Sequence, residues 1–215
     1  MNDLTEMNGI VLKSEPYGEY DRRLVLLTKE AGKITAFARG ARKTSSRLLA
    51  PTNLFCFGKF KLYPTRSAYN LIEADISNFF DDLRKDFTAA YYGMFFLELA
   101  DYYSVENMEA EELLILLYLS LKALGNDHIP RELVRVIFEI RAQYINGEFP
   151  GAPEEALNDT KYTVQHITGS PYEKLFTFIV SEEVMNELTS MTEHYRNKYI
   201  GRHFNSLEIL KTLQE

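Results

Sequence analysis

The spacing of apolar residues changes near Ser77. Before this point, short segments either alternate apolar with polar residues or are wholly apolar, as in half-buried and buried strands. After it, apolar residues recur every three to five positions, as on one side of a helix. The sequence therefore predicts an α+β chain, with a strand domain over residues 1–78 and an all-α helical domain over residues 79–215.

Five strands are predicted in the first domain. Gly32 is expected to close a tight hairpin in the left-handed region, and Gly58 to mark a bulge. Five strands in about 75 residues, with hairpin spacing and one longer connection, fit a small Greek-key barrel, although an SH3-like barrel fits the strand count nearly as well. The predicted strands cover residues 4–15, 23–28, 33–39, 54–63 and 69–76.

The second domain is predicted to be a bundle of helices. Asn126, Pro130, Gly147 and Ser181 supply start and stop signals, and Ser170 opens a capping box with proline after it. Residues 147–170 are expected to be the least helical part, and 113–124 to form the buried central helix. The predicted helices cover residues 78–104, 110–124, 130–146 and 181–200, with a last one from 205 or 206.

Basic residues dominate the stretch 22–61, which carries ten of them against a single acid, Glu30. Cationic strands that also carry aromatic rings suit single-stranded nucleic acid, because phosphates need positive charge and bases stack on rings. Solvated strand faces are the alternative, although acids would then be interspersed. Phe37, Phe55, Phe57 and Phe60 are each more typical of barrel core than of a base platform.

Phosphate contacts are predicted first for the basic exit of the third strand, which Arg39, Arg42 and Lys43 form. Further basic residues are expected to extend this track, namely Arg22, Arg23, Lys33 and Arg47, with Lys13, Lys59 and Lys61 as weaker candidates. The net charge of −7 divides into +4 over residues 1–80 and −11 over the remainder. This asymmetry predicts DNA binding by the first domain and protein binding by the second.

Several classes of function have no support in the sequence. There is no apolar run of membrane-spanning length, no signal peptide at the start and one cysteine, Cys56, so a soluble cytoplasmic protein is expected. A phosphate-binding glycine loop is absent, and His194 and His203 are nine residues apart, which does not place them on one helical face. Ser45 and Ser46 have no histidine nearby in sequence. We predict neither an enzyme nor a bound cofactor.

The chain resembles the RecO family of bacterial recombinational repair proteins. The resemblance rests on residues 9–13, 17–22, 27–33 and 38–43 with Ser46, and more diffusely on residues 138–141, Gly147, Pro150 and Ser206. It implies an OB-fold barrel joined to a helical domain, in a cytoplasmic, nucleoid-associated protein without enzymatic activity. It also implies binding of single- and double-stranded DNA, and annealing of DNA strands. The protein would act together with a RecR-like partner, and would help to load recombinase onto DNA coated by single-strand binding protein.

Two expectations concern the helical domain. Many RecO proteins carry a four-cysteine zinc site after the positions of Gly147 and Pro150, whereas residues 148–160 hold no cysteine here, so no zinc is expected. Packing by Phe149, Leu157, Tyr162 and Val164 is expected to hold this segment instead. The resemblance further implies that the acidic tail of single-strand binding protein is a partner.

We predict that this tail docks on the helix over residues 130–146, where basic residues flank apolar ones: Arg131, Arg135, Phe138 and Arg141, with Ile137 beside them. Arginines paired with Glu132 and Glu139 are an equally good interpretation. If so, the tail site is expected around residues 196–202. In an alternative to the DNA-binding function, the acidic helical domain recruits repair partners and the barrel binds nucleic acid only weakly.

Overall fold

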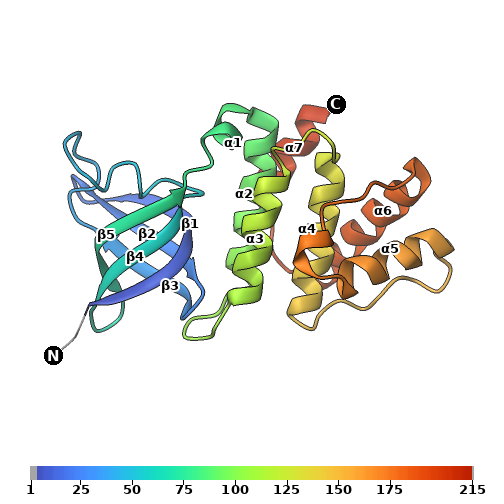
Figure 1. Cartoon of the computed structure of the whole chain (residues 1–215), viewed down its shortest axis with the longest axis horizontal. Coiled ribbons are helices and arrows are strands. Elements are labelled where there is room, and N and C mark those ends of the chain that lie inside the picture. The colour runs from blue at the N-terminus through green and yellow to red at the C-terminus, as the bar shows by residue number, and fades with distance from the viewer. Residues whose placement is uncertain (1–3, 215) are drawn as a thin grey trace. The chain divides into compact units, whose positions relative to one another are not determined.

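The computed structural model describes residues 4–214, and it begins with five strands that curl into a closed barrel (Figure 1). The strands are β1 (Thr5–Tyr17), β2 (Asp21–Thr28), β3 (Gly32–Ala38), β4 (Phe57–Pro64) and β5 (Tyr69–Asn78). Their order around the barrel is β1-β2-β3-β5-β4, and β4 returns to β1. This order confirms the predicted OB-fold.

Closure depends on one short parallel contact between β3 and β5. It joins Ala36 to Tyr69 and Phe37 to Asn70, whereas every other neighbouring pair in the barrel is antiparallel. The alternating pattern of β3 sets the direction of its side chains: Ile34, Ala36 and Ala38 face inward, while the residues between them face outward. The seam between β3 and β5 therefore has the fewest paired residues in the barrel.

Apolar side chains fill the barrel, and Cys56 is fully buried among them, as predicted for a small core residue. Phe55 and Phe60 are also buried, which excludes them as base platforms. At Gly58 the register of β4 against β5 shifts, and a Cβ atom would lie 2.1 Å from the Asp75 carbonyl oxygen. The predicted bulge is confirmed, and its close backbone approach explains the glycine.

The hairpin of β2 and β3 is fastened to a segment far along the chain. Gly32 has the expected left-handed φ of 62°, and a Cβ there would lie 2.2 Å from the carbonyl oxygen of Val105. The Lys33 amide donates to that same oxygen at 3.2 Å, and the Ala110 amide donates to the Lys29 carbonyl at 3.0 Å. These bonds make residues 105–110 part of the barrel's own structure.

The chain just before this segment supplies a charge partner for the barrel. Asp101 is buried, and its carboxylate contacts Lys13 at 2.8 Å and Lys33 at 3.4 Å. Four aliphatic side chains on the outside of β1 and β2 are also buried, namely Ile10, Leu12, Val25 and Leu27. The first compact unit accordingly comprises the residues up to Asp81 together with Leu97–Leu114. The expected boundary near residue 78 separates strands from helices, but the compact units divide the chain differently.

Seven α-helices and one 3₁₀ turn follow the barrel in the described part of the chain. They are α1 (Asp81–Lys85), α2 (Phe87–Tyr103), α3 (Glu111–Ala123), α4 (Arg131–Ile145), α5 (Asn158–Gly169), η1 (Tyr172–Lys174), α6 (Glu182–Tyr199) and α7 (Asn205–Gln214). Ser181 caps α6 as predicted, since its hydroxyl accepts from the Val184 amide. No helix of residues 4–214 is long and apolar enough to cross a membrane.

Four predictions about the helices were wrong. The helix expected over residues 78–104 is interrupted at Asp86, whose carboxylate accepts from the Ala89 amide and begins α2. α5 lies in the segment expected to be least helical. The capping box at Ser170 opens only the short turn η1 rather than a full helix. The most completely buried helix is α4, where every residue from Leu133 to Gln143 is buried, rather than α3, which exposes Ile115 and Lys122.

Candidate nucleic-acid interface

A row of outward-facing side chains crosses the barrel from β4 to β1. Cross-strand pairing joins Tyr63 to Asn70, Asn70 to Phe37, Phe37 to Arg23 and Arg23 to Glu15. Successive side chains of a strand point to opposite faces, and each of these residues follows or precedes an inward-facing residue, so its own side chain points outward. The row therefore places two aromatic rings and a guanidinium on one surface.

The ends of the strands add to this row. The rings of Tyr17 and Phe37 lie 4.8 Å apart, and Tyr17 is 53% exposed. The turn between β1 and β2 is joined to the loop after β3, because the Arg42 amide donates to the Tyr20 carbonyl at 2.8 Å. Lys43 Nζ lies 5.2 Å from the centre of the Tyr20 ring. Two loops separated in sequence thus form one surface with the row.

We call this region the β2–β3 surface. It is defined by Tyr17, Tyr20, Arg23, Phe37, Arg39, Arg42, Lys43 and Arg47. All are exposed except Phe37, which is half-buried. Arg23 contacts Glu15 at 3.3 Å, whereas Arg39, Arg42, Lys43 and Arg47 form no ion pair with any residue of the described chain. Apart from Arg23, the basic side chains of this surface therefore carry positive charge that no ion pair neutralises within the described chain.

Two residues predicted to contact phosphates have structural roles instead. Arg22 is half-buried, and its guanidinium donates to Thr52 Oγ1 at 2.8 Å, Asn53 Oδ1 at 2.9 Å and the Leu49 carbonyl at 3.2 Å. Burial and the nearby charge of Arg42 lower the pKa of the Arg22 guanidinium. Lys33 donates to the Asp101 carbonyl at 2.8 Å as well as contacting its carboxylate. Both donors hold chain segments together, so both are removed from the predicted track.

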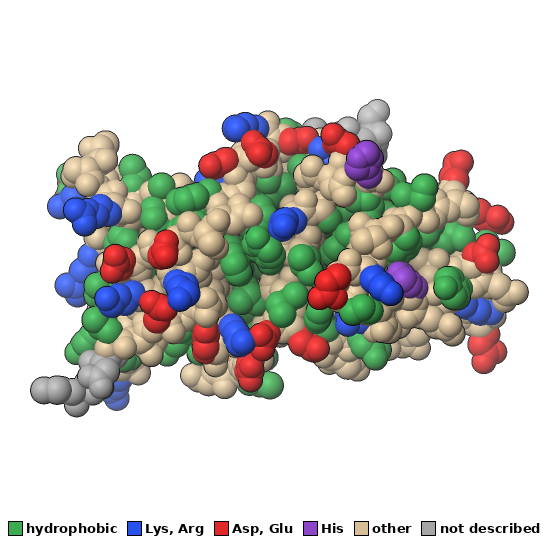
Figure 2. Space-filling view, viewed as in Figure 1, with side chains coloured by type: hydrophobic (Ala, Val, Ile, Leu, Met, Phe, Trp, Pro, Cys, Tyr) green, Lys and Arg blue, Asp and Glu red, His purple; other side chains and the backbone are tan. Residues whose placement is uncertain are grey.

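The weaker candidates Lys59 and Lys61 lie on a different part of the barrel, which we call the β4–β5 face. It is defined by Glu6, Lys59, Lys61 and Glu73. Lys59 contacts Glu6 at 3.2 Å and Lys61 contacts Glu73 at 3.9 Å. Figure 2 shows acidic and basic atoms mixed over the barrel face turned to the viewer, and basic atoms gathered at its left edge. On the β4–β5 face, the lysines therefore fit the alternative interpretation, in which basic and acidic residues are interspersed on a solvated strand face.

Sequence reasoning missed several residues of the interface. Tyr20 is 46% exposed and Tyr63 is 41% exposed, and Arg66 is exposed in the turn between β4 and β5. OB-folds bind ligands with the face of strands 2 and 3 and with the loops that join strands 1 to 2 and 4 to 5, which are the positions of these residues. The sequence signal that could have identified Tyr20 and Tyr63 is that each tyrosine flanks a predicted turn.

The arginines predicted on α4 do not form an accessible pocket. Phe138 is fully buried, and Arg135 is buried against Glu139 and Glu132. Glu139 also contacts Arg196 at 2.6 Å. The prediction that Phe138 and Arg135 contact the tail is therefore not supported, because both are buried and the carboxylate partners of Arg135 lie one turn away on the same helix. The alternative tail site around residues 196–202 meets the same difficulty, because Arg196 is buried and contacts Glu139.

The other arginines of α4 are also engaged. Arg131 contacts Asp86 at 2.5 Å. Arg141 donates to the carbonyls of Ile167 and Thr168 at the end of α5, and its guanidinium lies 5.2 Å from the Tyr172 ring. Its charge thereby faces the negative end of a helix dipole.

The segment after Gly147 is held by packing and by one tyrosine. Tyr195 donates its hydroxyl proton to the Gly151 carbonyl at 2.9 Å, and its ring contacts Phe149. Val164 is buried as expected, but Tyr162 is 71% exposed, so its predicted packing role was wrong. Within residues 4–214, no three His, Cys, Asp or Glu side chains are grouped so as to hold a metal ion.

Comparisons with known proteins agree with this fold. The family model described as "Recombination protein O N terminal" matches residues 1–80, and the one described as "Recombination protein O C terminal" matches residues 84–151. A DNA repair protein RecO from Acetivibrio thermocellus is 29% identical, with 96% of each chain covered. One from Alkaliphilus metalliredigens is 34% identical over 68% of this chain and 60% of its own. The chain belongs to the RecO family of DNA repair proteins.

Proposed function

We propose that this repair protein binds single-stranded DNA on the β2–β3 surface. The observation that carries the proposal is a group of exposed basic side chains without carboxylate partners, placed beside the exposed rings of Tyr17 and Tyr20. Arginine and lysine would neutralise phosphates, and the rings would stack on unpaired bases. Arg66 and Tyr63 extend the path toward the turn between β4 and β5.

The finer role that we propose is that of a non-enzymatic mediator. A surface that holds a strand by its phosphates and bases can present it for annealing to a second strand. Membership in a DNA repair family supports a further role in loading recombinase onto DNA coated by single-strand binding protein, with a RecR-like partner. Any contact with the tail of single-strand binding protein requires a surface other than α4, whose Phe138 and Arg135 are buried.

Salt-dependent binding tests the DNA proposal. The experiment titrates fluorescent oligothymidine with the full chain over a range of salt concentrations, comparing wild type with the double variant Arg39→Glu, Lys43→Glu. Arg42 is left intact because its guanidinium also donates to the Glu19 carbonyl. Losing two phosphate contacts should lower the affinity by about ten- to a hundredfold and reduce the salt slope by about two.

The double variant Lys59→Glu, Lys61→Glu is the matched control, since it makes the same change in net charge on the β4–β5 face. Its affinity should fall far less, by about threefold at most, because the change acts there only through the general field. Equal losses in the two double variants would contradict the proposed surface. Weak, salt-insensitive binding by wild type would favour the adaptor alternative.

A further inference from the structure

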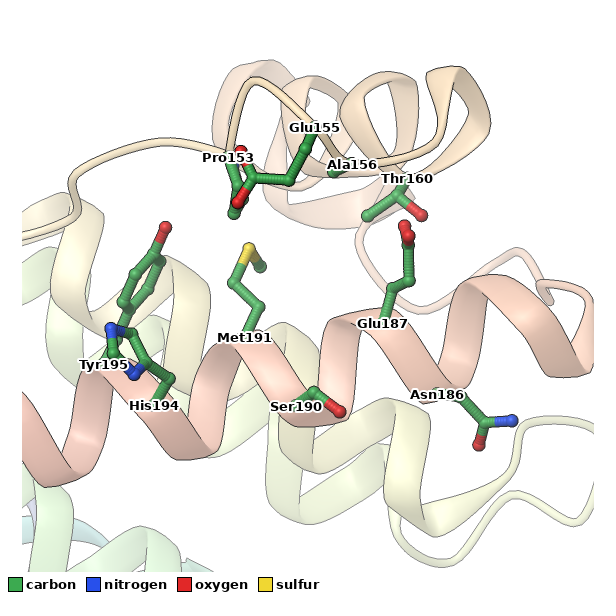
Figure 3. Close-up of a pocket in the computed structure, with 10 residues that line it drawn as sticks. All are labelled: Pro153, Glu155, Ala156, Thr160, Asn186, Glu187, Ser190, Met191, His194 and Tyr195. Carbon is green, nitrogen blue, oxygen red and sulfur yellow. The ribbon is translucent and has the colours of Figure 1, made fainter.

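A groove lies between α6 and the segment that leads into α5. Its volume is about 510 Å³, and Figure 3 shows side chains from both elements directed toward it. The principal lining residues are Pro153, Glu155, Thr160, Glu187, Met191 and Tyr195.

The floor of the groove is apolar and fixed. Met191 is 6% exposed and Tyr195 is 8% exposed. The hydroxyl of Tyr195 is held by its bond to the Gly151 carbonyl, so this ring does not swing out to fill the space. An apolar side chain, or the methylene stem of a long one, would gain contact area on these two residues.

The rim of the groove is acidic. Glu155 and Glu187 line it from opposite elements, and no lysine or arginine lines it. Glu187 also accepts from the Leu157 amide at 3.1 Å, which fixes its carboxylate beside the start of α5. Glu155 forms no hydrogen bond or ion pair with the rest of the described chain. Its negative charge acts on the groove, since burial first and then the charges of Tyr199 and Glu155 raise the pKa of Tyr195.

One polar group in the groove lacks a partner. Thr160 is 1% exposed, and its Oγ1 has no hydrogen-bond partner within the described residues. A buried hydroxyl without a partner costs free energy. The same side chain lines the groove opposite Glu187 (Figure 3).

We propose that this groove docks a segment of a partner protein that presents a lysine or arginine beside an apolar side chain. The cationic head would lie between Glu155 and Glu187. The methylene stem and its apolar neighbour would cover Met191 and Tyr195. An acidic segment or a DNA backbone would be repelled by the same carboxylates. This docking function is separate from DNA binding and does not depend on it.

Peptide binding to the full chain tests the proposal. The probe is a short fluorescent peptide in which leucine alternates with arginine, and the matched probe has glutamate in place of arginine. Wild type should bind the arginine peptide and not the glutamate peptide. Glu155→Lys should weaken arginine-peptide binding by about tenfold, because it replaces an attractive charge by a repulsive one. A methyl NMR signal from Met191 should shift on titration with the arginine peptide.

Glu173→Lys is the control, because Glu173 is exposed on η1, does not line the groove, and gives the same change in net charge. It should leave peptide affinity within about twofold of wild type. Equal losses in the two variants, a preference for the glutamate peptide, or an unmoved Met191 signal would each overturn the proposal. Ser190→Trp, which fills the groove from the exposed side of α6 without changing charge, should also abolish the shift.

Discussion

The molecule has two regions rich in arginine, and they use it in opposite ways. On the β2–β3 surface, Arg39, Arg42 and Arg47 are exposed and have no carboxylate partner in the described chain. In the second unit, Arg135, Arg141 and Arg196, which we call the arginine core, are buried against carboxylates or carbonyls. Both regions present the same residue type in sequence, so burial and partners decide whether an arginine binds a ligand or stabilises the fold.

The largest expected effect comes from the shared carboxylate of the arginine core. Glu139 is fully buried and contacts both Arg135 and Arg196. Glu139→Ala would leave two buried guanidinium groups without their partner, at a cost of about 3–5 kcal/mol in the free energy of unfolding. Urea unfolding measures this cost. Glu132→Ala, which removes a half-exposed partner of Arg135, should cost less than about 1 kcal/mol. Equal costs in the two variants would contradict the idea that the buried carboxylate of Glu139 stabilises the arginine core more than an exposed one.

Next in size is the contact between Arg141 and the end of α5. Arg141→Met should cost about 2–3 kcal/mol, because it removes charged hydrogen bonds to the carbonyls of Ile167 and Thr168. The exposed Lys174, changed to Met, is a control with almost no expected cost. Neither variant should alter DNA affinity when it is measured under conditions in which the protein is fully folded. A change in DNA affinity on Arg141→Met would show that the arginine core is not purely structural.

On the β2–β3 surface the expected effect is on binding rather than on stability. Tyr17→Ala removes a ring that is half exposed, and it should weaken oligothymidine binding by about 1–2 kcal/mol through lost base stacking. The salt slope should not change, because no phosphate contact is lost. Tyr162→Ala, at an exposed tyrosine of α5, should leave affinity as it is. A reduced salt slope in the Tyr17 variant would contradict a stacking role.

The smallest effect concerns Arg131, which is neither fully exposed nor buried. The Ala89 amide, and then Arg131, lower the pKa of Asp86. A lowered folded-state pKa contributes stability above the unfolded value of about 3.9, and this contribution is lost as pH falls through the folded pKa. Arg131→Gln should therefore destabilise the protein by less than about 1 kcal/mol at neutral pH, and by less still once the pH has fallen below the folded-state pKa of Asp86. Thermal unfolding of wild type and variant, measured from neutral to acidic pH, checks both the destabilisation and its decrease at low pH.

Much of the barrel was predictable because its signals are local. Strand bounds, the hairpin glycine Gly32 and the bulge at Gly58 follow from alternation and glycine conformation. The candidate interface was predicted less completely. The exposed members Arg39, Arg42 and Lys43 were found from charge density, whereas the pairing of Lys59 with Glu6 depends on strand register that density does not report.

The failures have different physical causes, and one of them is a contact distant along the chain. Lys33 was assigned to DNA because its partner, Asp101, is far away in sequence. α5 was missed although its buried side chains, Thr160, Val164 and Ile167, stand at helical spacing, because prolines and glycines around the segment favoured a loop. On α4 the signal was present, since Glu132 and Glu139 stand at helical spacing from Arg135.

The discontinuous first unit has a consequence for how the protein is made. All five strands leave the ribosome before residue 80, yet the partners of Lys29, Lys33 and Gly32 are synthesised later, between Asp101 and Glu111. Until Leu114 has emerged, the nascent barrel lacks the backbone bonds that fasten its hairpin and shows aliphatic side chains on its outside. A fragment that stops at Asn78 would remain in that incomplete state, so expression of the barrel alone calls for a chain that extends through α3.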